Sequence, residues 1–404
     1  MPQPYCDVAI VGGSIAGLRA AQTVARHAPD LTITMISDET HPPYERPPLS
    51  KVGLTKQMSL DALIYPAVNE LRSHGVNFLL GTTAEELDVD ARKVVHSSGT
   101  LHYRSLVIAT GCEAIIPPAL SGLPDIFTLR RYDDAVSLRR ALANPLKSVA
   151  IVGAGFIGGE LASMLANEGR RVALIDLARK PLGRFGEPVF RDYEALHRGA
   201  GVVLRFGEQV VDVVDQGDGR VLELGDGSRV PADVIVLGVG VRPSTEWLQQ
   251  SGLRVENGIH CDGALRAADH VFAAGDVVRW PNQRWDTDMR VEHWTNAAEQ
   301  GRVAGINAAN DILGLPLEVC ANVPYFWSDQ HGVRIQFAGH RAGDEEIIES
   351  RNSSGSLFIY RRSDIVTGVL AFERRADFVK IRTMLKNELT WQPVRSLIDR
   401  ENSR

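Results

Sequence analysis

The sequence predicts an α/β protein with two dinucleotide-binding domains, followed by a smaller C-terminal α+β domain. Two glycine-rich segments carry this prediction, VAIVGGSIAG from Val8 and VAIVGAGFIGGE from Val149, because each directly follows an apolar, strand-like run. The order of strand and turn signals after the first segment recurs after the second, which indicates an internal duplication. One chain is therefore expected to bind two dinucleotides.

Each segment has the spacing of a strand–turn–helix phosphate site. The first glycine of such a turn permits a tight bend, the second lets the backbone approach a pyrophosphate, and the third lets the helix pack on the strand. The second segment has all three glycines, at Gly153, Gly155 and Gly158. The first segment has a serine in the middle, reading Gly12, Ser14 and Gly17, with Gly13 adding local freedom. Serine is small enough for this position, and the phosphates are expected on the amides of the helix N-terminus.

In the first half, the elements follow one another as a βαβ unit. A helix is predicted from near Ile15 to about His27–Pro29, followed by a parallel strand in LTITMIS from Leu31. A hairpin is predicted over 94–103 with its turn at Ser98–Gly99, and LVIATG from Leu106 reads as a buried strand.

The second half repeats this order. The strand VALID ends at Asp176, a hairpin turns through 225–227, and VIVLGVGV from Val234 follows. The segment HVFAAGDV from His270 lies beyond this second unit, so the first domain is expected to resume there. After Pro324 the strand-like VRIQFAG and SLFIYRR precede a helical DFVKIRTMLKNEL. The predicted domains are residues 1–111 with 246–323, an inserted domain at 112–245, and a C-terminal domain at 324–404.

Composition excludes several classes of function. The chain has 404 residues, 44% hydrophobic and 23% charged, which supports a sizeable core. Its net charge of -6 gives no positive field suited to nucleic acid. The four cysteines have no disulfide or zinc spacing, and the apolar runs are too short to cross a bilayer. We expect a cytoplasmic protein without metal, without nucleic-acid or membrane partners, and monomeric.

The order of GGSIAG, YERPPLSK, ATG, GAGFIGGE, AAGD and YFWSDQ resembles the FAD- and NADH-dependent ferredoxin reductases that serve oxygenases. This family includes the reductases of putidaredoxin, rubredoxin and aromatic-ring dioxygenase systems, and the resemblance extends over nearly the whole chain. It implies a glutathione-reductase-like arrangement of two Rossmann-like domains.

The resemblance implies a set of FAD-binding residues. Asp38 would accept the adenosine ribose hydroxyls, although a solvated turn acid is an equally open interpretation, and Asp276 would bind the ribityl chain. The implied contacts are Gly12, Gly13, Ser14, Ala16, Gly17, Ser37, Asp38, Arg46, Lys51, Ala84, Ala109, Thr110, Gly111, Arg130, Gly275, Asp276, Glu292, His293, Trp294 and Trp327.

A second set of residues is expected to bind NADH. Asp176 ends its strand where a carboxylate can accept the ribose hydroxyls and repel a 2′-phosphate. Arg179 and Lys180 follow closely, so NADPH stays open as the alternative. The expected contacts are Gly153, Gly155, Phe156, Ile157, Gly158, Glu160, Asp176 and Gly240.

By the same resemblance, Lys51, Glu160 and Trp327 form the catalytic group. A Lys51–Glu160 pair would place positive charge beside the flavin, and Trp327 would lie next to the ring. The alternatives are that Glu160 is an ordinary first-turn helix acid and that Trp327 is a core residue.

The stretch YERPPLSK contains no cysteine, so electrons must leave from the flavin itself rather than through a thiol pair. The expected function is therefore an NADH-dependent reductase that passes electrons through FAD to a small acidic iron–sulfur ferredoxin, with rubredoxin as the alternative carrier, and indirectly to an oxygenase. Arg302 is the expected docking arginine. An NADH oxidase or diaphorase, and a redox-sensing flavoprotein resembling apoptosis-inducing factor, are the rival interpretations.

Overall fold

The computed structural model describes residues 4–51, 58–123, 125–217 and 219–402. The chain forms two compact units. Unit 1 comprises Met1–Glu45, Ser59–Glu113 and Arg242–Pro324, and unit 2 comprises Arg46–Met58, Ala114–Val241 and Tyr325–Arg404. After residues 46–58, which belong to unit 2, the chain leaves unit 1 again within β7 (Cys112–Ala114) and re-enters it within β16 (Val241–Pro243). These two strands pair with each other.

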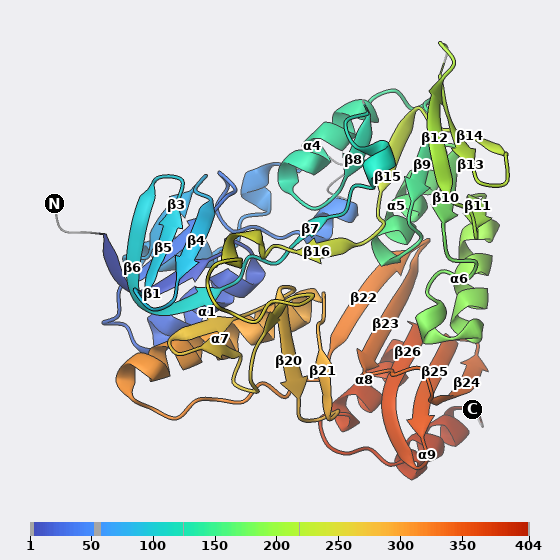
Figure 1. Ribbon diagram of the computed structural model, residues 1–404. Helices are drawn as coiled ribbons and strands as arrows, with labels where there is room; N and C mark the ends of the chain where they lie inside the picture. The colour runs from blue at the N-terminus through green and yellow to red at the C-terminus, as the bar shows by residue number, and fades with distance from the viewer. Residues whose placement is uncertain (1–3, 52–57, 124, 218, 403–404) are drawn as a thin grey trace. The chain divides into compact units, whose positions relative to one another are not determined.

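Unit 1 is built on a sheet with the order β18-β19-β6-β1-β2-β3, to which β4 and β5 add a hairpin (Figure 1). Its strands are β1 (Tyr5–Val11), β2 (Ile33–Ser37), β3 (Asn77–Leu80), β4 (Ala84–Asp88), β5 (Lys93–His96), β6 (Gly99–Ile108), β18 (Arg266–Ala268) and β19 (Val271–Ala273). Strand β1 pairs in parallel with β2 and β6, and β19 adds in parallel to β6. The segment from His270 therefore returns to the first sheet, as its sequence predicted.

Helices α1 (Ile15–His27), α3 (Ala67–Ser73) and α7 (Trp294–Leu313) belong to unit 1, as does a three-stranded sheet of β17 (Ile259–His260), β20 (Val278–Asn282) and β21 (Thr287–Met289). Helix α1 packs along α7 (Figure 1). The contact is close because α7 presents glycines to α1: a Cβ on Gly301 would lie 2.2 Å from the carbonyl oxygen of Ala16, and one on Gly305 would lie 2.6 Å from that of Ala20. This packing fixes the helix that begins at the first glycine-rich turn.

Unit 2 repeats the βαβ construction in a five-stranded sheet with the order β11-β10-β9-β15-β8. Its strands are β8 (Ile126–Thr128), β9 (Val149–Val152), β10 (Val172–Asp176), β11 (Val203–Phe206) and β15 (Val234–Leu237), and its helices are α4 (Tyr132–Ala141), α5 (Phe156–Asn167) and α6 (Glu187–Gly199). A separate antiparallel sheet contains β12 (Val210–Asp215), β13 (Arg220–Leu224) and β14 (Arg229–Pro231). Strand β15 is completely buried, as expected for a parallel strand covered on both faces.

The C-terminal part of unit 2 is an antiparallel sheet with the order β22-β23-β26-β25-β24. It contains β22 (Tyr325–Gln330), β23 (Val333–Gly339), β24 (Glu346–Asn352), β25 (Gly355–Arg362) and β26 (Ile365–Glu373), followed by α8 (Arg375–Met384) and α9 (Trp391–Asn402). Strand β22 packs on α5 through rings: Phe156 lies 4.5 Å from Phe326 and 5.7 Å from Phe185, centroid to centroid. The α/β class with two dinucleotide-binding folds and a C-terminal α+β part is thus confirmed.

One predicted element ends early. The helical pattern from Asp377 was expected to continue through Leu389, whereas α8 ends at Met384. The chain then leaves the helix because Leu389 is buried and its carbonyl accepts a hydrogen bond from the Val366 N–H at 2.8 Å. Tertiary pairing with β26 therefore overrides the local helical preference.

Across the described parts of the chain, no helix is long and apolar enough to cross a membrane. In the same residues, no group of three or more metal-ligating side chains gathers.

Candidate active site

The first glycine-rich turn is shaped by contacts between backbone atoms. Gly12 has a φ of 125°, and a Cβ there would lie 2.1 Å from the carbonyl oxygen of Ala109. A Cβ on Gly17 would lie 1.9 Å from the carbonyl oxygen of Gly12, and one on Gly13 would lie 2.5 Å from the Ser37 hydroxyl. The backbone packing of strand, turn and helix therefore requires glycine at Gly12 and Gly17, whereas at Gly13 the neighbour is the Ser37 side chain.

In the second turn, backbone packing requires Gly153 and Gly158, as it requires their equivalents in the first turn, but it does not require Gly155. Cβ atoms on Gly153 and Gly158 would lie 2.2 Å and 1.9 Å from the carbonyl oxygens of Gly238 and Gly153. A Cβ on Gly155 would meet no described atom within 4 Å, and the φ of Gly155 is -73°. Neither packing nor backbone conformation requires glycine there. Open space beside the N-terminus of α5 fits the close approach of a pyrophosphate.

Ser14 occupies the equivalent position in the first turn. It is the N-cap of α1, yet its side chain makes no capping hydrogen bond. A serine N-cap ordinarily bonds an amide of the first helical turn. The first turn therefore keeps a hydroxyl that can contact a phosphate in place of the missing glycine.

The remaining residues of the first set gather at the carboxyl ends of the unit 1 strands. Ser37 ends β2 and Asp38 is exposed directly after it, while Ala109, Thr110 and Gly111 follow β6. The Thr110 hydroxyl donates to the Ser244 carbonyl at 2.9 Å. Ala84 is the exception in this set, since it begins β4 and does not follow the end of a strand.

Helix α7 places beside the turn that carries Asp276 a buried donor that sequence reasoning missed. Gln300 of α7 is fully buried and accepts a hydrogen bond from the Gly275 N–H at 2.9 Å. Its side-chain nitrogen has no hydrogen-bond partner within the described ranges. An unsatisfied buried donor is costly, so this nitrogen fits a polar group of a bound ligand.

The other predicted residues of unit 1 surround the start of α7. His293 is the N-cap of this helix, and the Trp294 indole donates to the Tyr65 hydroxyl at 3.0 Å. Glu292 pairs with Arg290 at 2.7 Å, and Arg290 also donates to the Asp276 carbonyl at 3.2 Å. The loop before α7 and the turn at Asp276 are thus joined by one arginine.

Asp176 connects the second turn to the end of β10. One carboxylate oxygen accepts the Ala154 N–H at 2.6 Å, and the other accepts the Ala178 N–H at 2.7 Å. Both bonds fix the carboxylate beside the turn and leave further lone pairs for hydroxyl donors. Leu177 next to it is 71% exposed, an apolar surface at the predicted adenosine end that sequence reasoning did not single out.

The two basic residues beyond Asp176 differ in their surroundings. Lys180 forms an ion pair with Glu187, whereas the Arg179 side chain packs over Gly207, where a Cβ would lie 2.7 Å from Arg179 Cγ. Elsewhere in the second set, Ile157 of α5 is 49% exposed and Gly240 has a φ of 110°.

Glu160 is the centre of the predicted catalytic group. Its side chain is 7% exposed, and Lys51 Nζ lies 3.1 Å from Oε1. The Ser50 hydroxyl donates to Oε2 at 2.6 Å, and the Ser328 hydroxyl donates to Oε1 at 2.8 Å. The Asp329 N–H also approaches Oε1 at 3.3 Å. This buried carboxylate, at the end of GAGFIGGE, is therefore satisfied by donors from the two strings YERPPLSK and YFWSDQ.

Trp327 lies on the opposite face of β22 from Ser328. Lys51 Nζ lies 5.8 Å from the Trp327 ring centroid, and Tyr325 stacks on Trp327 with centroids 5.9 Å apart. Arg46, which begins the same loop as Lys51, donates to the Arg130 carbonyl at 3.2 Å. Lys51, Glu160 and Trp327 thus form one cluster in unit 2.

None of the cysteines resembles a redox pair. Burial raises the pKa of the Cys6 and Cys320 thiols to about 12, and burial also raises that of Cys261. Cys112 is buried and donates to the Asp276 carbonyl at 3.5 Å. None of the four forms a disulfide, and thiols with such pKa values are poor nucleophiles at neutral pH.

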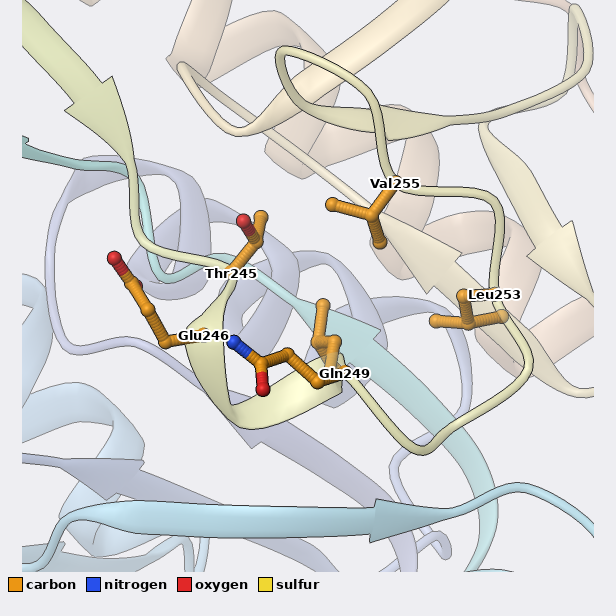
Figure 2. A pocket seen from close by; sticks show the side chains of 6 residues that line it. Thr245, Glu246, Gln249, Leu253 and Val255 are labelled. Atoms are coloured by element: carbon orange, nitrogen blue, oxygen red, sulfur yellow. The ribbon is translucent and has the colours of Figure 1, made fainter.

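A hollow of about 370 Å³ lies in unit 1 on the 3₁₀ turn over 246–248 and the loop after it, shown in Figure 2. The side chains that line it are Thr245, Glu246, Leu248, Gln249, Leu253 and Val255. None of them belongs to the predicted site, and Glu246 pairs with Arg242 at 3.4 Å. Each glycine-rich turn, rather than this hollow, therefore defines a candidate nucleotide site in its own unit.

Two family models match the chain. The pyridine nucleotide-disulphide oxidoreductase model matches residues 6–301, and the reductase C-terminal model matches residues 325–402.

Solved structures are similar over almost the full length. The covalent putidaredoxin reductase–putidaredoxin complex shares 29% identity with a TM-score of 0.89, and the match covers 96% of this chain and 94% of the other. The ferredoxin reductase for the CYP199A2 system from Rhodopseudomonas palustris shares 29% identity with a TM-score of 0.88 and coverage of 95% and 96%. Fdr9 shares 32% identity with a TM-score of 0.84 and coverage of 95% of each chain.

Proposed function

Since the chain belongs to the pyridine nucleotide-disulphide oxidoreductase family, we propose that it passes electrons from NADH through FAD to an iron–sulfur ferredoxin that supplies an oxygenase. The family resemblance seen in the sequence is confirmed by the two matching models, and with it an oxidoreductase that binds FAD and NAD(H). The observation that carries the proposal is the similarity, over at least 95% of this chain, to the solved structures of putidaredoxin reductase with putidaredoxin and of a ferredoxin reductase.

FAD would be held by the first turn and the strand ends of unit 1. The amides at the N-terminus of α1 and the Ser14 hydroxyl would bind its pyrophosphate. Asp38 would accept the ribose hydroxyls, and Asp276 with the Gln300 nitrogen would bind polar groups nearer the flavin.

NADH would be held by the second turn in unit 2. Gly155 leaves room for its pyrophosphate, and the fixed Asp176 carboxylate would accept the ribose hydroxyls and repel a 2′-phosphate. Because Lys180 already pairs with Glu187, we propose that NADH is preferred over NADPH.

Bound FAD would supply the chemistry that couples a two-electron hydride donor to one-electron carriers. The chain contributes position and charge: Glu160 holds the Lys51 ammonium at 3.1 Å, and Trp327 offers an aromatic surface beside it. No described side chain of this group is required to donate or accept a proton. Precise placement of the reacting groups is the main catalytic contribution.

Electrons would leave to a one-electron protein carrier because the buried, high-pKa thiols offer no disulfide relay. An acidic carrier would be steered by positive charge. Arg302, the arginine expected from the sequence to serve this purpose, is paired with Glu299 at 2.8 Å and with Glu318 at 3.0 Å. Its charge is thus balanced locally, so we propose a supporting role in steering.

The test is reduction of a panel of small iron–sulfur ferredoxins and a rubredoxin by the purified yellow protein, with NADH and NADPH compared. Oxygen uptake without a carrier is recorded in parallel. Rapid NADH-driven reduction of one ferredoxin with little oxygen uptake supports the proposal. Rapid oxygen uptake without carrier preference would instead establish an oxidase.

A further inference from the structure

A chain of hydrogen bonds runs from Glu160 into the core of unit 2. Its links are Ser328 Oγ to Glu160 at 2.8 Å, Gln330 Nε2 to Ser328 Oγ at 2.9 Å, His197 Nε2 to Gln330 Oε1 at 2.8 Å, and His331 Nε2 to His197 Nδ1 at 3.1 Å. Ser328, Gln330 and His197 each have a relative exposure of 0%. The proposed catalytic carboxylate is therefore the end of a buried polar network.

The bonds in this chain all point the same way. Burial lowers the pKa of His197 to about 4, so its ring is neutral near pH 7 and carries one N–H. Gln330 Oε1 can only accept, which places that hydrogen on His197 Nε2 and makes Nδ1 the acceptor for His331. Each donor thus faces toward Glu160.

The orientation of the Gln330 amide decides where the Ser328 hydroxyl points. Gln330 Nε2 donates to Ser328 Oγ and approaches the Phe156 carbonyl at 3.4 Å. A flipped amide would set its oxygen against the Phe156 carbonyl, so the contact with Phe156 fixes the orientation in which Nε2 faces Ser328. Because the serine oxygen accepts from Gln330, its own hydrogen remains for Glu160.

Gly159 provides the space that Gln330 occupies. A Cβ at this position would lie 2.7 Å from Gln330 Oε1 and 2.9 Å from Nε2. Glycine inside a helix is destabilising, and Gly159 has no positive φ to justify it. Of the two adjacent glycines in GGE, Gly158 serves the turn, whereas Gly159 serves the Gln330 amide.

We propose that Gln330 is a positioning residue, which turns the Ser328 hydroxyl toward Glu160 and so holds the Glu160 carboxylate against Lys51. His197 acts one step further away by fixing the Gln330 amide. The consequence for hydride transfer rests on the proposed function, whereas the geometric effect on Lys51 does not.

The direct test is the reactivity of Lys51 in the holoenzyme. Trace acetylation with acetic anhydride is followed by peptide mass spectrometry, with exposed Lys386 as the internal reference. We expect Gln330→Leu and Ser328→Ala each to raise the labelling rate of Lys51 about fivefold, because one hydrogen bond to its partner carboxylate is lost. Lys386 should not change. If Lys51 is acetylated at the wild-type rate in both variants, the proposal is overturned.

Two pairs of variants separate positioning from a general loss of packing. His197→Gln keeps an N–H that can donate to Gln330, so it should label like the wild type, whereas His197→Phe should resemble Gln330→Leu. Gly159→Ala changes none of the residues in the chain of hydrogen bonds, and it should also expose Lys51 because its Cβ would displace the Gln330 amide. Thr367→Val, which removes another buried hydroxyl of the same sheet, is the matched control and should have no effect. Equal labelling in His197→Gln and His197→Phe would contradict the role of His197.

Stopped-flow reduction of bound FAD by NADH gives the functional readout. We expect Gln330→Leu to lower the limiting rate about tenfold with the apparent Kd for NADH within about twofold of wild type. The double variant with Ser328→Ala should show no further loss, since both residues act through one bond. If the wild-type protein is not reduced by NADH, the proposed function fails while the labelling still tests the inference. If the wild type is reduced and Gln330→Leu matches it, the inference fails alone.

Discussion

Acidification is expected to destabilise the protein through the buried ring of His197. This ring has a relative exposure of 0%, contacts Tyr193 edge to face at 4.6 Å, and hydrogen-bonds Gln330 and His331. Burial lowers its pKa from 6.5 to about 4, and the neighbouring His331 acts in the same direction. The folded protein therefore keeps His197 neutral over a range of pH in which the unfolded chain protonates it.

The sign and size follow from proton linkage. Between pH 6.5 and about 4 the unfolded chain binds the additional proton, so the free energy of unfolding falls as the pH falls. The stabilisation is complete above pH 6.5 and is lost progressively down to about pH 4. At about 1.4 kcal/mol for each pH unit, the difference amounts to about 3 kcal/mol.

Urea unfolding of the wild type and His197→Gln, followed by far-UV circular dichroism from pH 7.5 to 4.5, measures this contribution. The glutamine does not titrate, yet can still donate to Gln330. His340 and His96 also have pKa values lowered by burial and affect both proteins alike, so the difference between the two curves measures His197 together with its bonded neighbour His331. The wild type should lose about 2–3 kcal/mol more than the variant over this range. Parallel curves would refute the assignment of a buried neutral ring.

Three further predictions concern the nucleotide sites and the carrier. Gly155→Ala should change the free energy of unfolding by less than about 1 kcal/mol and raise the KM for NADH about tenfold. Gly158→Ala should cost about 3 kcal/mol because its Cβ would lie 1.9 Å from a carbonyl oxygen; equal stability of the two variants would contradict this distinction. Asp176→Ala should lower kcat/KM for NADH at least about tenfold while that for NADPH falls less, as steady-state assays with both nucleotides would show. Arg302→Glu should raise the KM for ferredoxin and leave ferricyanide reduction unchanged, whereas Glu318→Gln should lower that KM; equal effects on both acceptors would exclude docking there.

The local chemistry of the sequence was sufficient for the turns and the duplicated sheets. The start of α1 at Ile15 and the end of β10 at Asp176 follow from apolar runs that meet glycine turns. The Lys51–Glu160 pair, by contrast, joins residues far apart in sequence and was expected from the family resemblance. No periodicity in either segment would have predicted it.

The rest of the candidate site depends on tertiary register. Ser328 and Gln330 alternate with Trp327 along β22, so a pattern of strand residues alone does not say which face meets α5. The sequence signal that could have pointed to the network was Gly159, the second glycine of GGE, because glycine within a helix is destabilising unless packing or function requires it. What requires glycine there is the Gln330 amide, and this contact forms only when β22 packs against α5.

The two glycine-rich turns show how a fold requirement can be separated from a binding requirement. In both turns a Cβ on the first or the last glycine would lie about 2 Å from a backbone carbonyl oxygen, so a Rossmann-like turn needs these glycines whether or not it binds a dinucleotide. The middle position differs. In the second turn a Cβ on Gly155 would meet open space, and in the first turn the N-cap Ser14 has a hydroxyl that makes no capping hydrogen bond. Because nothing in the protein itself requires either residue, the middle position is where the choice of residue bears on the ligand. A serine there costs the first turn none of its packing and gives it a hydroxyl for the phosphate.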